Sequence, residues 1–85
     1  MLKPLVFTAH AHTRLAERKI RASWVEETAY DPDWTERDPN DPAVERRFRA
    51  IRQFEGRVLQ VACVETPTAI RVISMMFDRN ARRRS

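Results

Sequence analysis

Arg57-Val58-Leu59-Gln60-Val61-Ala62-Cys63-Val64-Glu65 is the stretch that decides the fold. Leu59, Val61 and Cys63 stand at alternate positions, so one face of an extended chain would be apolar and the other face mixed. A period of two residues is typical of a strand and not of a helix. We therefore expect this stretch to be the central strand of a sheet.

Two further runs of strand length flank this central strand, residues 46–54 before it and residues 69–77 after it. Glu55-Gly56 and Thr66-Pro67-Thr68 separate the runs and are typical of turns. The order predicts an antiparallel meander, with residues 5–8 as a short additional edge strand. The first run is suited to a strand with one solvated face, because it carries Arg46, Arg47, Arg49 and Arg52.

Two helices are predicted before the meander. Residues 9–19 are good helix formers without proline or glycine, and Thr8 is a suitable N-cap. A second, short helix is expected from Ser23-Trp24-Val25-Glu26, which matches a capping box, to Asp31-Pro32. Residues 33–42 are expected to form a loop. The predicted fold class is α+β, with two N-terminal helices packed on a three- to four-stranded antiparallel sheet.

Length and composition indicate a single domain over residues 1–85, ending in a basic tail, residues 79–85, that is expected to be ordered only if it docks. No apolar run approaches bilayer length, and the N-terminus lacks the hydrophobic region of a secretion signal. Cys63 is the sole cysteine and is interpreted as a small buried hydrophobic side chain. We expect a cytoplasmic protein without a membrane partner.

Charge is segregated along the chain. Six acids and one base fall between Asp31 and Glu45, so this acidic segment carries a net charge of −5 and leaves +9 on the rest. Arginine provides 14 of the 16 basic residues, and its planar guanidinium suits phosphate recognition. Codon bias from a GC-rich genome explains the arginine preference equally well. The sequence leaves open whether the acidic segment covers the basic surface.

Five short motifs stand out along the chain: Phe7-Thr8-x-His10-Ala11-x-x-Arg14-Leu15-x-Glu17-Arg18-x-Ile20, Trp24-Val25-Glu26, Asp31-Pro32-x-Trp34, Gly56-Arg57-Val58-Leu59 and Phe77-Asp78-Arg79. Together they resemble the uncharacterised domain-of-unknown-function family 4258. Family members commonly have glycine where this chain has Lys19, so a left-handed helix end there would be strained by about 1 kcal/mol. More distantly, residues 47–84 resemble BrnT toxins, ribonucleases of bacterial toxin–antitoxin pairs, which implies a RelE-like fold.

RNA cleavage by attack of the 2′-hydroxyl needs a base, an acid and cations. His10, Arg14 and Arg18 recur at helical spacing and form a polar ridge on the first predicted helix. His12 lies about 200° around the helix from His10, so one helix face cannot present both. His10 matches the family motif and is the preferred catalytic histidine. The predicted catalytic residues are His10, Arg14, Arg47 and Arg71, without a metal or a cofactor. Further residues predicted to bind nucleic acid are Arg18, Arg46, Arg49, Arg52, Arg57 and Arg79.

Three functions fit these residues. The first is a toxin-like, metal-independent endoribonuclease, with RNA as substrate and an acidic or DNA-binding antitoxin-like protein as partner. The second is a non-catalytic module whose arginines bind nucleic acid or an acidic protein. The third is a relative that keeps the fold and has lost the activity. His10 is also explained as a structural helix histidine, and the arginines as ion-pair partners of the acidic segment.

Overall fold

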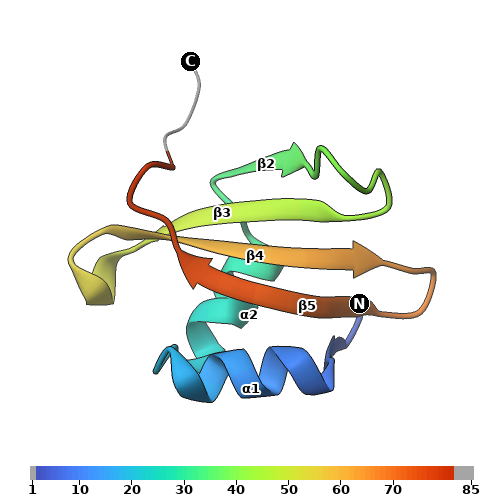
Figure 1. Cartoon of the computed structure of the whole chain (residues 1–85), viewed down its shortest axis with the longest axis horizontal. Coiled ribbons are helices and arrows are strands. Elements are labelled where there is room, and N and C mark those ends of the chain that lie inside the picture. The colour runs from blue at the N-terminus through green and yellow to red at the C-terminus, as the bar shows by residue number, and fades with distance from the viewer. Residues whose placement is uncertain (1, 82–85) are drawn as a thin grey trace.

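The computed structural model describes residues 2–81 and shows helices packed against one sheet (Figure 1). The elements are β1 (Leu5–Phe7), α1 (Ala9–Glu17), α2 (Ala22–Tyr30), β2 (Trp34–Arg37), β3 (Glu45–Ile51), the 3-10 helix η1 (Arg52–Phe54), β4 (Arg57–Glu65) and β5 (Ile70–Phe77). The sheet order is β1-β5-β4-β3-β2. Neighbouring strands are antiparallel except β1, which runs parallel to β5. The α+β prediction is confirmed, with five strands where three to four were expected.

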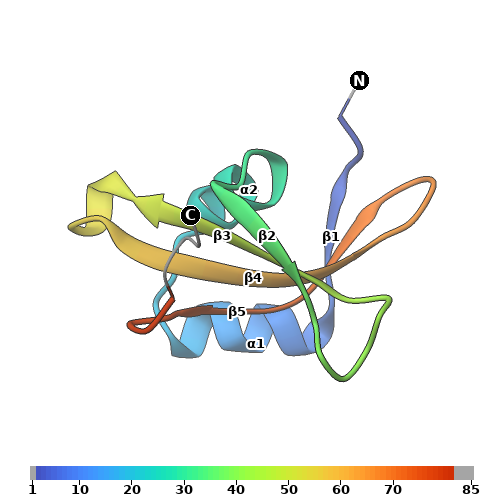
Figure 2. The ribbon, with the colours of Figure 1, turned by 90° about the horizontal axis from the view of Figure 1, so that it is seen from above.

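Both helices pack on the same side of the sheet and share one core. In Figures 1 and 2, α1 lies along β5, while α2 lies against β3 and β4. Leu59, Val61 and Cys63 of β4 are fully buried, so the predicted central strand is confirmed. Burial raises the pKa of the Cys63 thiol to about 11, as expected of a small side chain buried in the core. Within residues 2–81, no helix is long and apolar enough to cross a membrane.

Helix α1 begins as predicted and ends two residues earlier. The Thr8 hydroxyl accepts a hydrogen bond from the backbone N–H of Ala11 at 3.1 Å, so its role as N-cap is confirmed. The helix ends at Glu17 because Lys19 adopts the left-handed conformation, with φ of 53°. The left-handed helix end that would be strained for lysine is therefore present at this position.

The capping box predicted at the start of the second helix is wrong. Helix α2 begins at Ala22, and its N-cap is Arg21, whose side chain makes no capping hydrogen bond. Ile20 and Val25 occupy the positions of a hydrophobic staple, one before the N-cap and one in the first turn, and both are buried in the core. Packing of these two side chains therefore sets the helix start, and the Ser23 side chain does not cap it.

The loop predicted over residues 33–42 is wrong in its first part, because β2 forms there and pairs antiparallel with β3. The Trp34 and Phe48 rings stack at a centroid distance of 4.8 Å and an interplanar angle of 1°. This cross-strand contact stabilises a strand whose other residues are polar and exposed.

The strand predicted over residues 46–54 is shorter than expected. β3 ends at Ile51, and the chain continues through η1 into a turn where Glu55 and Gly56 have φ of 57° and 71°. The Gly56 N–H donates to the Ile51 carbonyl at 2.9 Å and closes this turn. Of the predicted basic tail, residues 82–85 lie outside the described part of the chain.

Candidate nucleic-acid interface

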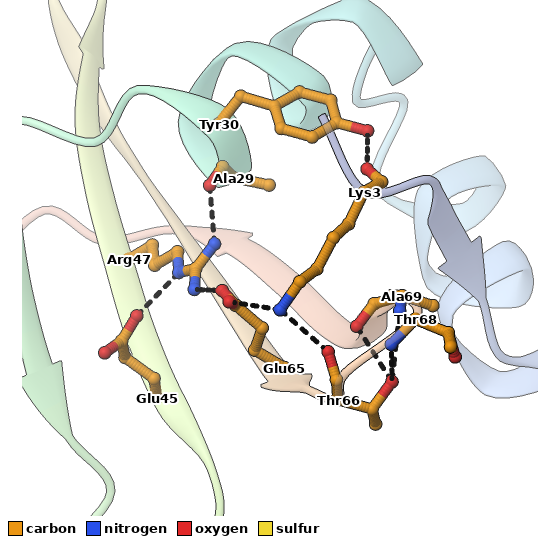
Figure 3. A network of polar contacts seen from close by, with 9 residues as sticks. All are labelled: Lys3, Ala29, Tyr30, Glu45, Arg47, Glu65, Thr66, Thr68 and Ala69. Atoms are coloured by element: carbon orange, nitrogen blue, oxygen red, sulfur yellow. Dashed lines mark hydrogen bonds and ion pairs between the residues drawn. The ribbon is translucent and has the colours of Figure 1, made fainter. Parts of the chain in front are cut away.

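Arg47 lies at the centre of a polar network that joins β3, β4 and α2 (Figure 3). Its Nε donates to Glu45 at 2.6 Å, its Nη2 to Glu65 at 2.8 Å, and its Nη1 to the Ala29 carbonyl at 2.6 Å. Burial acts to lower the pKa of Arg47, but its hydrogen bonds to Glu65 and Glu45 outweigh this effect and raise the pKa. All three nitrogens of the Arg47 guanidinium therefore make hydrogen bonds within the fold.

Glu65 extends this network to the N-terminal segment. The Lys3 Nζ donates to Glu65 Oε2 at 2.8 Å and to the Thr66 carbonyl at 2.9 Å, while the Tyr30 hydroxyl donates to the Lys3 carbonyl (Figure 3). Hydrogen bonds from Lys3 and Arg47 lower the pKa of Glu65 from 4.5 to about 2. The residues before β1 are thus tied to α2 and to the end of β4.

The other two arginines in the middle of β3 are also paired with the acidic segment. Arg49 Nη1 donates to the carbonyl and the carboxylate of Asp31 at 2.6 and 3.2 Å, and it lies 4.0 Å from Asp33 Oδ1. Arg46 Nη2 lies 3.1 Å from Asp38 Oδ2. The acidic segment therefore does cover part of the basic surface. We call Arg46, Arg47 and Arg49 the neutralised arginines.

Arg57 lies beside the β3–β4 turn and contacts aromatic rings instead of acids. Its guanidinium carbon lies 4.9 Å from the ring centroid of Phe54 and 5.8 Å from that of Phe77. No ion pair within residues 2–81 involves Arg57. A ring that contacts the flat face of a guanidinium holds it in place without using the N–H donors at its edge.

The rings around Arg57 form a compact group drawn from three separate elements. Trp24 of α2 stacks on Phe54 of η1 at 5.5 Å and meets Phe77 of β5 edge-on at 5.9 Å. The Arg21 guanidinium lies 5.7 Å from the Trp24 ring centroid. We call Arg21, Trp24, Phe54, Arg57 and Phe77 the hairpin-end cluster. Sequence reasoning missed it, because nothing in the sequence brings Trp24, Phe54 and Phe77 together.

A cavity of about 320 Å³ opens next to this cluster. Residues 55–58 line one part, and residues 77–79 and 81 line the other. Gly56-Arg57 and Phe77-Asp78-Arg79 belong to two of the motifs that carry the family resemblance. Motifs far apart in the sequence therefore meet in one cavity, and Arg57 and Arg79, both predicted to bind nucleic acid, are brought together there.

His10 and Arg14 contact each other on the outer side of α1. Arg14 Nε donates to His10 Nε2 at 3.2 Å, and Arg14 Nη1 lies 3.4 Å from Glu17 Oε1. The His10 Nε2 is the acceptor in this contact, so its lone pair faces the Arg14 guanidinium. Arg18 Nη1 donates to the Met75 carbonyl at 2.7 Å, so the predicted ridge continues toward the end of β5.

The four residues predicted as catalytic are not brought together. Arg47 faces α2, where it bonds the Ala29 carbonyl. Arg71 pairs with Val64, whose side chain points away from the helices, so Arg71 lies on the uncovered face of the sheet. His10 and Arg14 therefore form a pair of their own. In the described part of the chain, no three His, Cys, Asp or Glu side chains are grouped to hold a metal ion.

The fold and this interface define a small α+β domain with arginine and aromatic side chains gathered at one end. The family model described as "Domain of unknown function (DUF4258)" matches residues 7–77, and the chain belongs to this family. No curated protein and no solved structure matches the chain. The more distant resemblance to BrnT and RelE-like toxins stays a prediction.

Proposed function

We propose that the protein binds single-stranded RNA through the hairpin-end cluster. The observation that carries this proposal is the Arg57 guanidinium, which is held by Phe54 and Phe77 and has no acidic partner within residues 2–81. Its N–H donors are available to phosphate oxygens or to base edges. Single-stranded RNA exposes both kinds of acceptor, and surfaces that combine arginine with aromatic rings recognise it.

Further cations around the cluster support a path for the RNA backbone. Arg52 and Arg79 are exposed, and each lies within two residues of a cluster residue along the chain. The ridge on α1 reaches the Met75 carbonyl through Arg18, just before Phe77. Phosphates bound along these side chains would orient the strand, while the cluster contacts its bases.

This binding is tested by fluorescence anisotropy of a labelled single-stranded RNA of about 12 nucleotides, with an RNA duplex of the same length as control. We expect the single strand to bind more tightly than the duplex, because only unpaired bases can reach the cluster. Affinity should fall steeply as salt rises. Folded protein that binds neither RNA at low salt would refute the proposal.

A second candidate function, metal-independent endoribonuclease, is favoured by the contact between His10 and Arg14. A phosphate that binds Arg14 would draw its guanidinium away from His10 and release the Nε2 lone pair. His10 could then take the proton of the 2′-hydroxyl, whose oxygen attacks the phosphorus. The 5′-oxygen leaves and gains a proton from the imidazolium or from water. The products are a 2′,3′-cyclic phosphate and a 5′-hydroxyl.

Cleavage is tested in a buffer that contains a chelator, with end-group analysis of the products. Wild type should release 2′,3′-cyclic phosphate ends, and His10→Ala and Arg14→Ala should lose this activity. His12→Ala is the matched control on the same helix, because His12 packs on the Phe7 ring at 5.4 Å and should keep activity. RNA that stays intact after prolonged incubation with folded wild type would leave binding as the function.

We also propose a cytoplasmic partner of the antitoxin type, acidic or DNA-binding, that covers the hairpin-end cluster. The cluster suits such a partner because the acidic segment neutralises β3 and not Arg57. Overproduction of the protein should slow growth, and coproduction of the partner should restore it. Unaffected growth on overproduction would contradict a toxin role.

A further inference from the structure

The cavity beside the hairpin-end cluster presents hydrogen-bond donors and acceptors next to an apolar wall. Its lining includes two arginines, two carboxylates and two apolar side chains: Arg57, Arg79, Glu55, Asp78, Val58 and Phe77. A site for phosphate alone is poorly served by carboxylates, which repel the anion. The mixed lining instead suits a flat, neutral ligand that both accepts and donates hydrogen bonds.

Guanine is the RNA base that matches this lining most fully. Its N7 and O6 are adjacent acceptors, which arginine recognises with two hydrogen bonds. Its N1–H and N2–H groups are adjacent donors, which one carboxylate can accept together. Adenine, cytosine and uracil each lack at least one of these two pairs. The cavity volume of about 320 Å³ is at the lower end of the range for ligand sites and admits one base.

We propose that this cavity holds one guanine of a single-stranded RNA, with Arg57 at N7 and O6 and Glu55 at N1 and N2. The inference rests on the proposed RNA binding. Arg57 is oriented for this role by its contacts with Phe54 and Phe77. Arg79, which is exposed and lines the same cavity, would bind the phosphate next to this guanine.

Glu55 is chosen over Asp78 because of what each carboxylate already binds. Asp78 Oδ1 accepts a hydrogen bond from the Asn80 N–H at 2.9 Å. Glu55 makes no ion pair within residues 2–81, and the turn that carries it is closed by the bond from Gly56 to Ile51. Its carboxylate is therefore presented by a fixed backbone and keeps both oxygens for a ligand.

The test compares labelled oligouridines that carry one central guanine, adenine or inosine, titrated with the full chain. We expect guanine to bind about tenfold more tightly than adenine, because a good bidentate pair discriminates by about this factor or more. Inosine should fall between the two, since it keeps N7 and O6 and lacks the N2 donors. Guanosine 5′-monophosphate should compete more weakly than the guanine oligonucleotide.

Two variants with a matched control complete the test. Glu55→Gln should abolish the preference for guanine over inosine. Arg57→Gln should abolish the preference for guanine over adenine. Glu26→Gln, an exposed carboxylate on α2, should change neither preference.

Each contrary result has a distinct meaning. Oligouridine binding without a preference for guanine would overturn the guanine site and leave RNA binding in place. Competition by guanosine 5′-monophosphate, with no advantage for the guanine oligonucleotide, would show that the cavity takes a free nucleotide and would also overturn the inference. Absence of binding to every RNA by folded protein would overturn the proposed function together with the inference.

Discussion

Three arginines of β3 have carboxylates as partners, whereas Arg57 at the start of β4 has aromatic rings. Arg47 bonds two carboxylates and a carbonyl, and its side chain is only 11% exposed. Arg57 instead contacts the rings of Phe54 and Phe77, and no ion pair within residues 2–81 uses its charge. The partner of each arginine, and not the local density of arginines, therefore distinguishes the candidate interface from the rest of the basic surface.

The segregation of charge along the sequence explains this difference between the arginines. The acidic segment folds back on β3 and neutralises the strand that carries the densest run of arginines. In Figure 1 the loop after β2 and the turn after η1 lie at opposite ends of the sheet. The turn that carries the hairpin-end cluster therefore lies away from the acidic loop between β2 and β3.

The stability of the fold should depend most strongly on Arg47. Arg47→Gln removes three hydrogen bonds and leaves two carboxylates without their shared cation. We expect a loss of about 2–4 kcal/mol in the free energy of unfolding. Thermal unfolding should show a Tm lower by at least about 10 °C.

Arg71→Gln is the matched control for this loss, because Arg71 is exposed on the uncovered sheet face. Its free energy of unfolding should stay within about 0.5 kcal/mol of wild type. Equal Tm values for the Arg47 and Arg71 variants would show that the network does not hold the fold together.

Acid should remove the contribution of Glu65 to the stability of the fold. The pKa of Glu65 in the folded protein, about 2, lies below its ordinary value of 4.5, so the carboxylate stabilises the fold above pH 4.5 and loses this contribution as pH falls toward 2. Glu65→Gln should be less stable than wild type near neutral pH, and the difference should shrink across that window. Glu26→Gln should show no such pH-dependent difference, and a constant gap for Glu65→Gln would contradict the ion-pair account.

Salt should reveal which arginines contact phosphate. Arg79→Gln should weaken RNA binding and reduce the slope of log affinity against log salt by about 0.7, because one phosphate contact to a single strand is lost. Arg46→Gln should leave the slope unchanged, since Asp38 already pairs with Arg46. An unchanged slope for the Arg79 variant would remove it from the RNA path.

Backbone strain and side-chain charge can be tested separately at Lys19. Lys19 has φ of 53°, and glycine adopts this conformation without steric cost. Lys19→Gly should raise the free energy of unfolding by about 0.5–1 kcal/mol relative to Lys19→Ala, which also has a Cβ atom. Both variants remove the same charge, so their RNA affinities should agree. A glycine variant less stable than the alanine variant would argue against strain at this turn.

Much of the fold could be predicted because its signals are local. Alternation in β4 and the Thr8 cap each depend on a few neighbouring residues. β2 was missed because its stability comes from a ring stack between Trp34 and Phe48, which are far apart in the sequence. The start of α2 was misplaced because core packing decided it.

The candidate site could be predicted only in part. The motifs pointed to Arg57 and Arg79, which do line one cavity. They did not show that Arg47 would pair with Glu45 and Glu65, because pairing depends on how the strands come together in the fold. Residue type alone cannot separate an arginine that holds the fold from one that is open to a ligand.

We propose that Arg57, and not the neutralised arginines, contacts RNA. This is tested by the anisotropy of a labelled single-stranded RNA, titrated at one salt concentration with wild type, Arg57→Gln and Arg49→Gln. The two substitutions remove the same charge, one from the hairpin-end cluster and one from the neutralised arginines. We predict that Arg57→Gln weakens binding about tenfold and that Arg49→Gln leaves it unchanged in protein shown to be folded. Equal losses, or a loss confined to Arg49→Gln, would contradict the account.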